Sequence, residues 1–172
     1  MSEKGGGAAG MAGLCGALLA LALVLSYAEA MIPIPIPVPG AKLGLANLVT
    51  VVGLYTVGTG ATVIVSLARI LLVGLTFGNL FSMLYGLGGW ALSIGVMVLL
   101  RKGAWFSPLG VSATGGAAHN LGQLIVAAMV VRTWGVFVYF PLLLAAGVAA
   151  GALIGILGGL VAVRLGKARG AR

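Results

Sequence analysis

Residues 109–131 read LGVSATGGAAHNLGQLIVAAMVV, an apolar run with His119, Asn120 and Gln123 near its middle. A helix needs about 20 apolar residues to cross the hydrocarbon core of a bilayer, and this run is long enough. Polar side chains at that depth are costly, and they normally face the interior of a helix bundle or a water-filled cavity. The run therefore predicts a membrane-spanning helix whose polar face is turned toward other parts of the protein.

The composition of the whole chain agrees with a membrane protein. The 172 residues are 61% hydrophobic and only 7% charged, and a soluble domain of this length could not bury so much apolar surface. Glycine occurs 30 times, which suits membrane helices because small residues let their backbones pack closely. The net charge of +8 is concentrated at loop ends and in the C-terminal tail. It therefore indicates contacts with anionic lipid rather than with nucleic acid.

The predicted fold class is an all-α integral membrane protein, a bundle of six transmembrane helices in one domain at residues 11–163. The predicted spans cover residues 11–30, 43–57, 61–76, 80–100, 109–131 and 140–163. The second and third are short for a complete crossing, so they are either tilted spans or a re-entrant hairpin. Residues 1–10 and 164–172 remain as an N-terminal tail and a basic C-terminal tail.

The basic residues predict the orientation, because cytoplasmic loops carry an excess of lysine and arginine. With the N-terminus inside, the inner side holds Lys4, Arg101, Lys102, Arg164, Lys167, Arg169 and Arg172. The outer side then holds only Lys42 and Arg132, so both termini are predicted to be cytoplasmic. The alternative for the first span is a signal peptide cleaved after Ala28-Glu29-Ala30, although the apolar run is long for such a segment.

Two predicted spans carry polar stripes at similar depth. On the fifth span, His119 and Gln123 share an arc of about 60° with Ser112 and Gly116, and Asn120 lies just beside it. The third span carries a similar stripe formed by Thr62, Ser66, Arg69 and Thr76. The two stripes predict a polar cavity between these helices, or else hydrogen bonds that only hold the bundle together.

Arg69 is the costliest of these residues, since a guanidinium inside a membrane must be paired, hydrated or bound to an anion. Glu29 is the only carboxylate expected at a similar depth. It is followed by Ile32-Pro33-Ile34-Pro35-Ile36-Pro37-Val38-Pro39-Gly40, which cannot be helical. This segment is either an apolar lid over the pocket or a rigid connector at the membrane interface. Lys42 and Asn47 come just beyond it.

The first predicted span carries small residues at every fourth position. They form two stripes, Ala9, Gly13 and Ala17, and Ala12, Gly16 and Ala20. Such stripes let another helix pack tightly against the span. The partner is either another subunit or, as the sequence alone slightly favours, a neighbouring helix of the same bundle.

Several kinds of chemistry are not expected of this chain. It contains no aspartate, and its only acids are Glu3 and Glu29, whereas a magnesium-dependent diphosphate enzyme needs clustered carboxylates. It has no G-x-x-x-x-G-K-[ST] motif for ATP, so any ATPase would be a separate chain. His119 and Cys15 are the only residues of their kinds, which argues against a metal site and an intrachain disulfide. We expect no enzyme activity and no cofactor.

Several strings in the sequence resemble one family. They are Pro39-Gly40-Ala41-Lys42-Leu43-Gly44-Leu45-Ala46-Asn47, Arg69, Leu87-Gly88-Gly89, Ser107-Pro108-Leu109-Gly110-Val111-Ser112 and His119-Asn120-Leu121-Gly122-Gln123. The resemblance is to the Gx transporter family, also labelled heptaprenyl diphosphate synthase component I, and it covers nearly the whole chain. That family is similar to the S components of energy-coupling factor (ECF) transporters, six-helix membrane proteins that bind a vitamin or similar nutrient from outside.

The resemblance implies a substrate-binding membrane subunit in the plasma membrane of a prokaryote. It would dock on a coupling membrane subunit and on ATPase subunits through the small-residue stripes of its first span. The predicted pocket residues are Arg69, His119, Asn120 and Gln123, with Glu29 beside Arg69 and with Lys42 and Asn47 near the mouth. Donors outnumber acids in this set, so an anionic or strongly polar small-molecule ligand is expected. The alternative is a non-catalytic membrane partner of an isoprenoid diphosphate synthase or of quinone metabolism.

Overall fold

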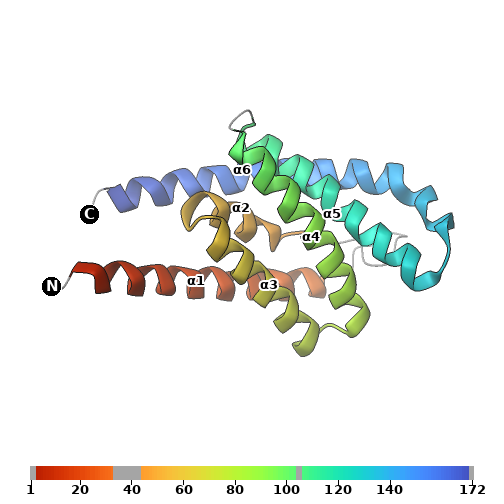
Figure 1. Ribbon diagram of the computed structural model, residues 1–172, viewed down its shortest axis with the longest axis horizontal. Coiled ribbons are helices and arrows are strands. Elements are labelled where there is room, and N and C mark those ends of the chain that lie inside the picture. Colours follow the sequence, from red (N-terminus) through yellow and green to blue (C-terminus); the bar gives the residue numbers. More distant parts are fainter. Residues whose placement is uncertain (1–2, 33–43, 104–105, 171–172) are drawn as a thin grey trace.

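The computed structural model describes residues 3–32, 44–103 and 106–170, and these form a helical bundle (Figure 1). Its elements are α1 (Glu3–Met31), α2 (Asn47–Thr56), α3 (Thr59–Thr76), α4 (Leu80–Lys102), α5 (Pro108–Val131), the 3-10 helix η1 (Trp134–Tyr139) and α6 (Phe140–Gly170). The predicted all-α class is therefore confirmed for the described part of the chain. Most of the proline segment, from Pro33 to Gly40, lies outside the described residues.

Five of the described helices are long and apolar enough to cross a membrane, with η1 and α6 counted as one stretch from Trp134 to Lys167. The short α2 is the exception. Its 10 residues extend for about 15 Å, roughly half of the hydrocarbon core of a bilayer. The second predicted span, for which the sequence left a complete crossing open, is thus a short helix in this structure. The first and last helices of the chain are longer than predicted, since α1 begins at Glu3 and α6 continues to Gly170.

A glycine turn folds α2 back onto α3. Gly58 has a φ of 88°, a left-handed value that costs glycine little, and its carbonyl accepts a hydrogen bond of 2.7 Å from the Thr62 hydroxyl. The end of α4 holds this turn in place. There the Arg101 Nη1 atom donates to Thr59 Oγ1 at 3.3 Å, and the guanidinium lies 5.3 Å from the centre of the Tyr55 ring. The hairpin of α2 and α3 is therefore anchored at the basic end of α4.

Helix α5 packs between α4 and α6, while α1 packs against α3. The contact of α5 with α6 brings backbone against backbone. A Cβ atom on Gly116 would collide with the Gly147 carbonyl, and one on Gly151 would collide with the Ser112 carbonyl. Packing this close is open only to glycine, which explains part of the high glycine content. In Figure 1 the start of α1 and the end of α6 lie at the same end of the molecule.

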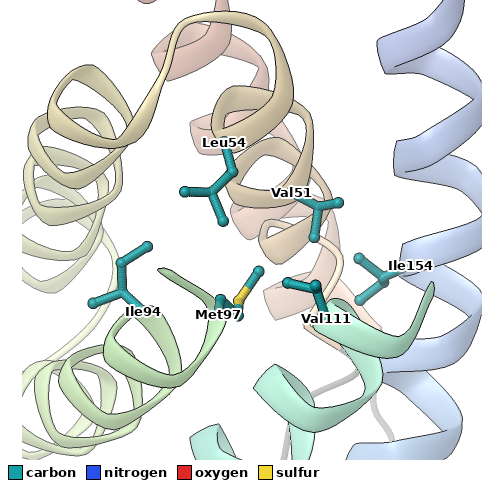
Figure 2. Packing of buried hydrophobic residues seen from close by; sticks show 6 residues of the cluster. All are labelled: Val51, Leu54, Ile94, Met97, Val111 and Ile154. Atoms are coloured by element: carbon teal, nitrogen blue, oxygen red, sulfur yellow. The ribbon is translucent and has the colours of Figure 1, made fainter. Parts of the chain in front are cut away.

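Six buried apolar side chains from four helices pack together in the bundle (Figure 2). This apolar core cluster consists of Val51 and Leu54 from α2, Ile94 and Met97 from α4, Val111 from α5 and Ile154 from α6. Its members from α4 and α5 belong to the second half of α4 and the first half of α5. A second cluster joins α1 to α2 and α3 through Leu18, Ala22, Val49, Val52 and Val65.

Candidate functional site

A cavity of about 250 Å³ brings together five of the seven residues that were predicted for the pocket. They are Glu29, Asn47, Arg69, His119 and Gln123. These side chains come from the end of α1, the start of α2, the second half of α3 and the second half of α5. The cavity also borders the start of α4, at the opposite end of that helix from Arg101 and Lys102. Polar faces from distant segments therefore meet around one space.

Arg69 reaches this cavity from α3 with one donor atom unpaired. Its Nη1 donates a long hydrogen bond of 3.4 Å to the Ser26 hydroxyl on α1, whereas its Nε is buried and has no partner among the residues that the structure describes. The carboxylate of Glu29 supplies a negative charge that attracts the guanidinium. Leaving a buried polar donor unsatisfied costs about 1–3 kcal/mol, and more for a charged group. The guanidinium of Arg69 is therefore held beside the cavity with part of its hydrogen-bonding capacity unmet.

A much smaller space, of about 10 Å³, borders Arg69 on the side of Thr62 and Ser66. Its volume is close to the minimum that holds one water molecule. The Ser66 hydroxyl is already engaged, because it donates to the Thr62 carbonyl at 2.7 Å and accepts from the Trp90 indole nitrogen at 2.7 Å. The larger cavity is thus the only one of the two spaces around Arg69, within the described part of the chain, with room for an organic ligand.

Glu29 ties the end of α1 to the turn that precedes α2. The side chain is only 7% exposed, and its Oε1 accepts a hydrogen bond of 2.5 Å from the Gly44 amide. Gly44 has a φ of 75°, and glycine tolerates this left-handed turn where other residues are strained. The turn sets the first residue of α2 at the cavity, so that Gly44 and Asn47 both line it. Glu29 therefore holds one edge of the cavity in shape.

Asn47 and Gln123 line the cavity with unused hydrogen-bonding groups. Neither side chain makes a hydrogen bond to the residues that the structure describes, and each amide offers two donor hydrogens and an acceptor oxygen. With His119, they also line a smaller hollow of about 40 Å³. These three residues, the shared wall, are therefore common to both spaces. The smaller hollow extends to Val51, Met97 and Ile154 of the apolar core cluster.

The start of α4 forms the rim of the cavity, and the sequence analysis did not place it there. Asn79 and Ser82 cap the helix together: the Ser82 amide donates to Asn79 Oδ1 at 2.8 Å, and the Asn79 amide donates to Ser82 Oγ at 3.0 Å. Their side chains are thus engaged in holding the helix end. Phe81 between them is 57% exposed, and Tyr85 lines the cavity one turn further on. The Asn-x-x-Ser spacing was the available sequence signal for this helix start.

Two predicted pocket residues are not among those lining the cavity. Asn120 projects toward α6 instead, where its Nδ2 atom donates a hydrogen bond of 2.6 Å to the Leu143 carbonyl. Its neighbour His119 lines the cavity, because adjacent residues of a helix point about 100° apart. Lys42 lies outside the described residues. Within the described part of the chain, no three histidine, cysteine or acidic side chains gather closely enough to hold a metal ion.

The two small-residue stripes of α1 are exposed, which differs from the slight preference of the sequence for a partner within the bundle. Their members are Ala9, Gly13, Ala17, Ala12, Gly16 and Ala20. A Cβ atom on Gly13 or Gly16 would meet no atom within 4 Å. The bundle instead packs on another face of α1, which carries the buried residues Leu18, Ala22, Ser26 and Glu29. The stripes thus remain uncovered by the described residues of this chain.

Comparison with known proteins gives one match. The model of the family described as heptaprenyl diphosphate synthase component I matches residues 18–161. No curated protein and no solved structure matches the chain. The match covers the second half of α1, the cavity with its shared wall, and α6 as far as Val161. The chain therefore belongs to the heptaprenyl diphosphate synthase component I family.

Proposed function

We propose that this protein is a membrane-embedded substrate-binding subunit of a transporter, similar to an S component, and that it captures a small polar or anionic nutrient or precursor. The observation that carries the proposal is the cavity itself. Arg69, Asn47 and Gln123 line one space although they come from three different helices, and the amides of Asn47 and Gln123 make no hydrogen bond within the described part of the chain. Groups that only joined helices to one another would have satisfied their hydrogen bonds within the bundle.

The direction of capture follows from the basic residues. Arg101 and Lys102 end α4, and Arg164 and Lys167 lie near the end of α6, whereas the cavity lies at the start of α4. The excess of basic residues marks the cytoplasmic side of a membrane protein. The cavity would therefore be in the outer half of the bundle, with both termini in the cytoplasm. This placement supports uptake across the plasma membrane of a prokaryote.

The chemistry of the cavity favours a compact ligand with hydrogen-bond acceptors. The positive charge of Arg69 favours a ligand with acceptor atoms or a negative charge, and the two amides of the shared wall bind either donors or acceptors. Apolar groups of Ile70, Val73 and Met83 complete the lining, which is the usual balance of a small-molecule site. The volume of about 250 Å³ lies just below the range of about 300–1,000 Å³ that is typical of small-molecule pockets. The ligand is therefore small.

The exposed stripes of α1 support a docking role. Small residues at every fourth position allow close approach of a second helix, and in this structure the positions are open. The resemblance to S components assigns such a surface to the coupling membrane subunit, which in turn carries the ATPases. Transport would then be driven by separate chains, since this sequence has no ATP-binding loop.

The family description favours a second candidate, a non-catalytic membrane component that associates with heptaprenyl diphosphate synthase. A seven-unit isoprenoid chain is far too long for the cavity of about 250 Å³. In this second role the chain would therefore contact the synthase or bind a short precursor, and it would leave the reaction to its partner. Proteins that co-purify with the chain distinguish the two candidates, because ATPase subunits support the first and a prenyl synthase supports the second.

Mass spectrometry after gentle purification tests the binding proposal directly. The wild-type protein is expected to retain a small molecule, and the Arg69→Ala and His119→Ala variants are expected to lose it while remaining folded in detergent. Arg164→Ala is the matched control, because this exposed arginine lies away from the cavity. If both cavity variants retain the same molecule as the wild type, the cavity is not the binding site.

A further inference from the structure

Two adjacent glycines of α4, Gly88 and Gly89, lie at the contact with α5, and they meet different neighbours there. A Cβ atom on Gly88 would collide with Val126 and would lie 3.1 Å from the Gly122 carbonyl oxygen, while a Cβ atom on Gly122 would collide with the Gly88 carbonyl. Gly88 and Gly122 therefore let the two helix backbones touch. Their role is to hold the helices together.

Gly89 is buried at the same crossing, but its nearest neighbours are side chains of the shared wall. A Cβ atom on Gly89 would lie 2.8 Å from His119 Cε1, 2.9 Å from His119 Nδ1 and 2.9 Å from Gln123 Cγ. These distances are shorter than van der Waals contact, so the imidazole and the amide chain would have to move. Both belong to α5 side chains that line the cavity and the smaller hollow. No backbone atom is among the three nearest neighbours.

We propose that Gly89 is a positioning residue of the candidate site: its missing side chain lets His119 and Gln123 lie flat against α4, and this sets the shape of the two spaces that they share. The inference rests on the proposed function for its biological meaning. Any side chain at position 89 would displace His119 and Gln123 and so redistribute volume between the cavity of about 250 Å³ and the hollow of about 40 Å³. Residue 89 thereby limits which ligand shapes fit.

The single histidine of the chain allows a test that needs no known ligand. Protein labelled with ¹⁵N- and ¹³C-histidine, with any affinity tag removed, gives imidazole NMR signals from His119 alone. We expect Gly89→Ala to shift these signals. Gly95→Ala is the matched control, because Gly95 is an exposed residue of the same helix and a Cβ atom there meets nothing within 4 Å. The control is expected to leave the signals unchanged.

A folded Gly89→Ala protein with wild-type imidazole signals would overturn the inference. So would a shift of equal size in Gly95→Ala. If Gly89→Ala is too unstable for NMR, thermal unfolding in a His119→Ala background decides the matter. Removing the imidazole is expected to restore part of the lost melting temperature of Gly89→Ala, but none of the loss in Gly88→Ala. Equal losses in both backgrounds would show that Gly89 does not act through His119.

Ligand retention separates this inference from the proposed function. If the wild type retains a small molecule, Gly89→Ala with shifted imidazole signals is expected to retain at least several-fold less of it. Unchanged retention despite that shift would overturn the positioning role for ligand binding. If the wild type retains no small molecule, the proposed function fails, and the imidazole signals still decide whether Gly89 positions His119.

Discussion

The side-chain amide of Asn120 donates a hydrogen bond of 2.6 Å to the Leu143 carbonyl and thereby ties α5 to α6. His119, the preceding residue, lines the cavity between α3, α4 and α5. Gly147 leaves space for this link, since a Cβ atom there would lie 2.8 Å from Asn120 Nδ2. Two adjacent polar residues of one helix thus differ in role, because Asn120 holds helices together while His119 borders an open space.

Replacement of Asn120 by alanine is expected to lower stability without affecting the cavity. The lost hydrogen bond corresponds to about 0.5–1.5 kcal/mol, measurable as a lower melting temperature in detergent. Ligand retention by the folded protein is expected to remain at the wild-type level. Thr114→Ala is a suitable control, since Thr114 is exposed on the same helix and bonds only within it. Loss of ligand in folded Asn120→Ala would place this residue in the binding site after all.

Replacement of Glu29 by glutamine isolates the charge of this side chain from its hydrogen bond. The amide oxygen can still accept from Gly44, but the negative charge that attracts Arg69 is removed. Breaking a buried charge pair costs up to about 3–5 kcal/mol, and here we expect the lower end, because Arg69 also faces the cavity. The double variant with Arg69→Ala is expected to lose less than the sum of the two single variants. Strict additivity in thermal unfolding would mean that the two charges are not coupled.

Alanine at Gly151 is expected to separate α5 from α6 and to prevent stable folding. The added Cβ atom would collide with the Ser112 carbonyl, and a backbone atom cannot turn away as a side chain can. Gly166 on the same helix is the control, since a Cβ atom there meets nothing within 4 Å. Gly166→Ala is expected to match or slightly exceed the wild-type melting temperature because alanine favours helix. Similar melting temperatures for both variants would contradict the close packing at Gly151.

Leucine at Gly16 tests the docking surface on α1. Because this position is open, Gly16→Leu is expected to leave the melting temperature of the isolated protein unchanged and to abolish co-purification of a coupling membrane subunit. Ala22→Leu on the buried face, where Ala22 is only 1% exposed, is expected to destabilise the protein itself. A marked loss of stability in Gly16→Leu would show that the stripe is covered within this chain.

The sequence predicted the helices and most of the cavity because hydrophobicity and helical periodicity are local properties. The run at 109–131 is the best case, since α5 spans Pro108–Val131 and its polar face lines the predicted cavity. Glu29 was the only carboxylate expected near Arg69, because few acids are available in the chain, and the two residues do line the same cavity. A partner can be found by excluding the other acids only in a chain with as few acidic residues as this one, which has two.

Other features depended on packing and could not be predicted in the same way. Asn120 lies beside the polar arc of α5, and only the position of α6 decides that it bonds to Leu143 instead of facing the cavity. Ser26 lies one helical turn before Glu29 and therefore on the same face of α1. This spacing could have predicted its contact with Arg69. Tyr85 enters the cavity only because α4 packs against α3. The sequence predicted the turn at Gly58-Thr59-Gly60 that ends α2, but not the turn at Gly44 that precedes the start of the helix at Asn47.

The apolar core cluster has a further consequence for the mechanism of passage. Its Val51, Met97 and Ile154 line the smaller hollow, and we expect this apolar packing to close the bundle at that end, so that the described helices form a dead-end pocket instead of a pore. A solute held there can leave only through the entrance it used, unless whole helices shift against one another. Vesicles that contain this chain alone are thus expected to bind such a solute yet keep their lumen sealed to it.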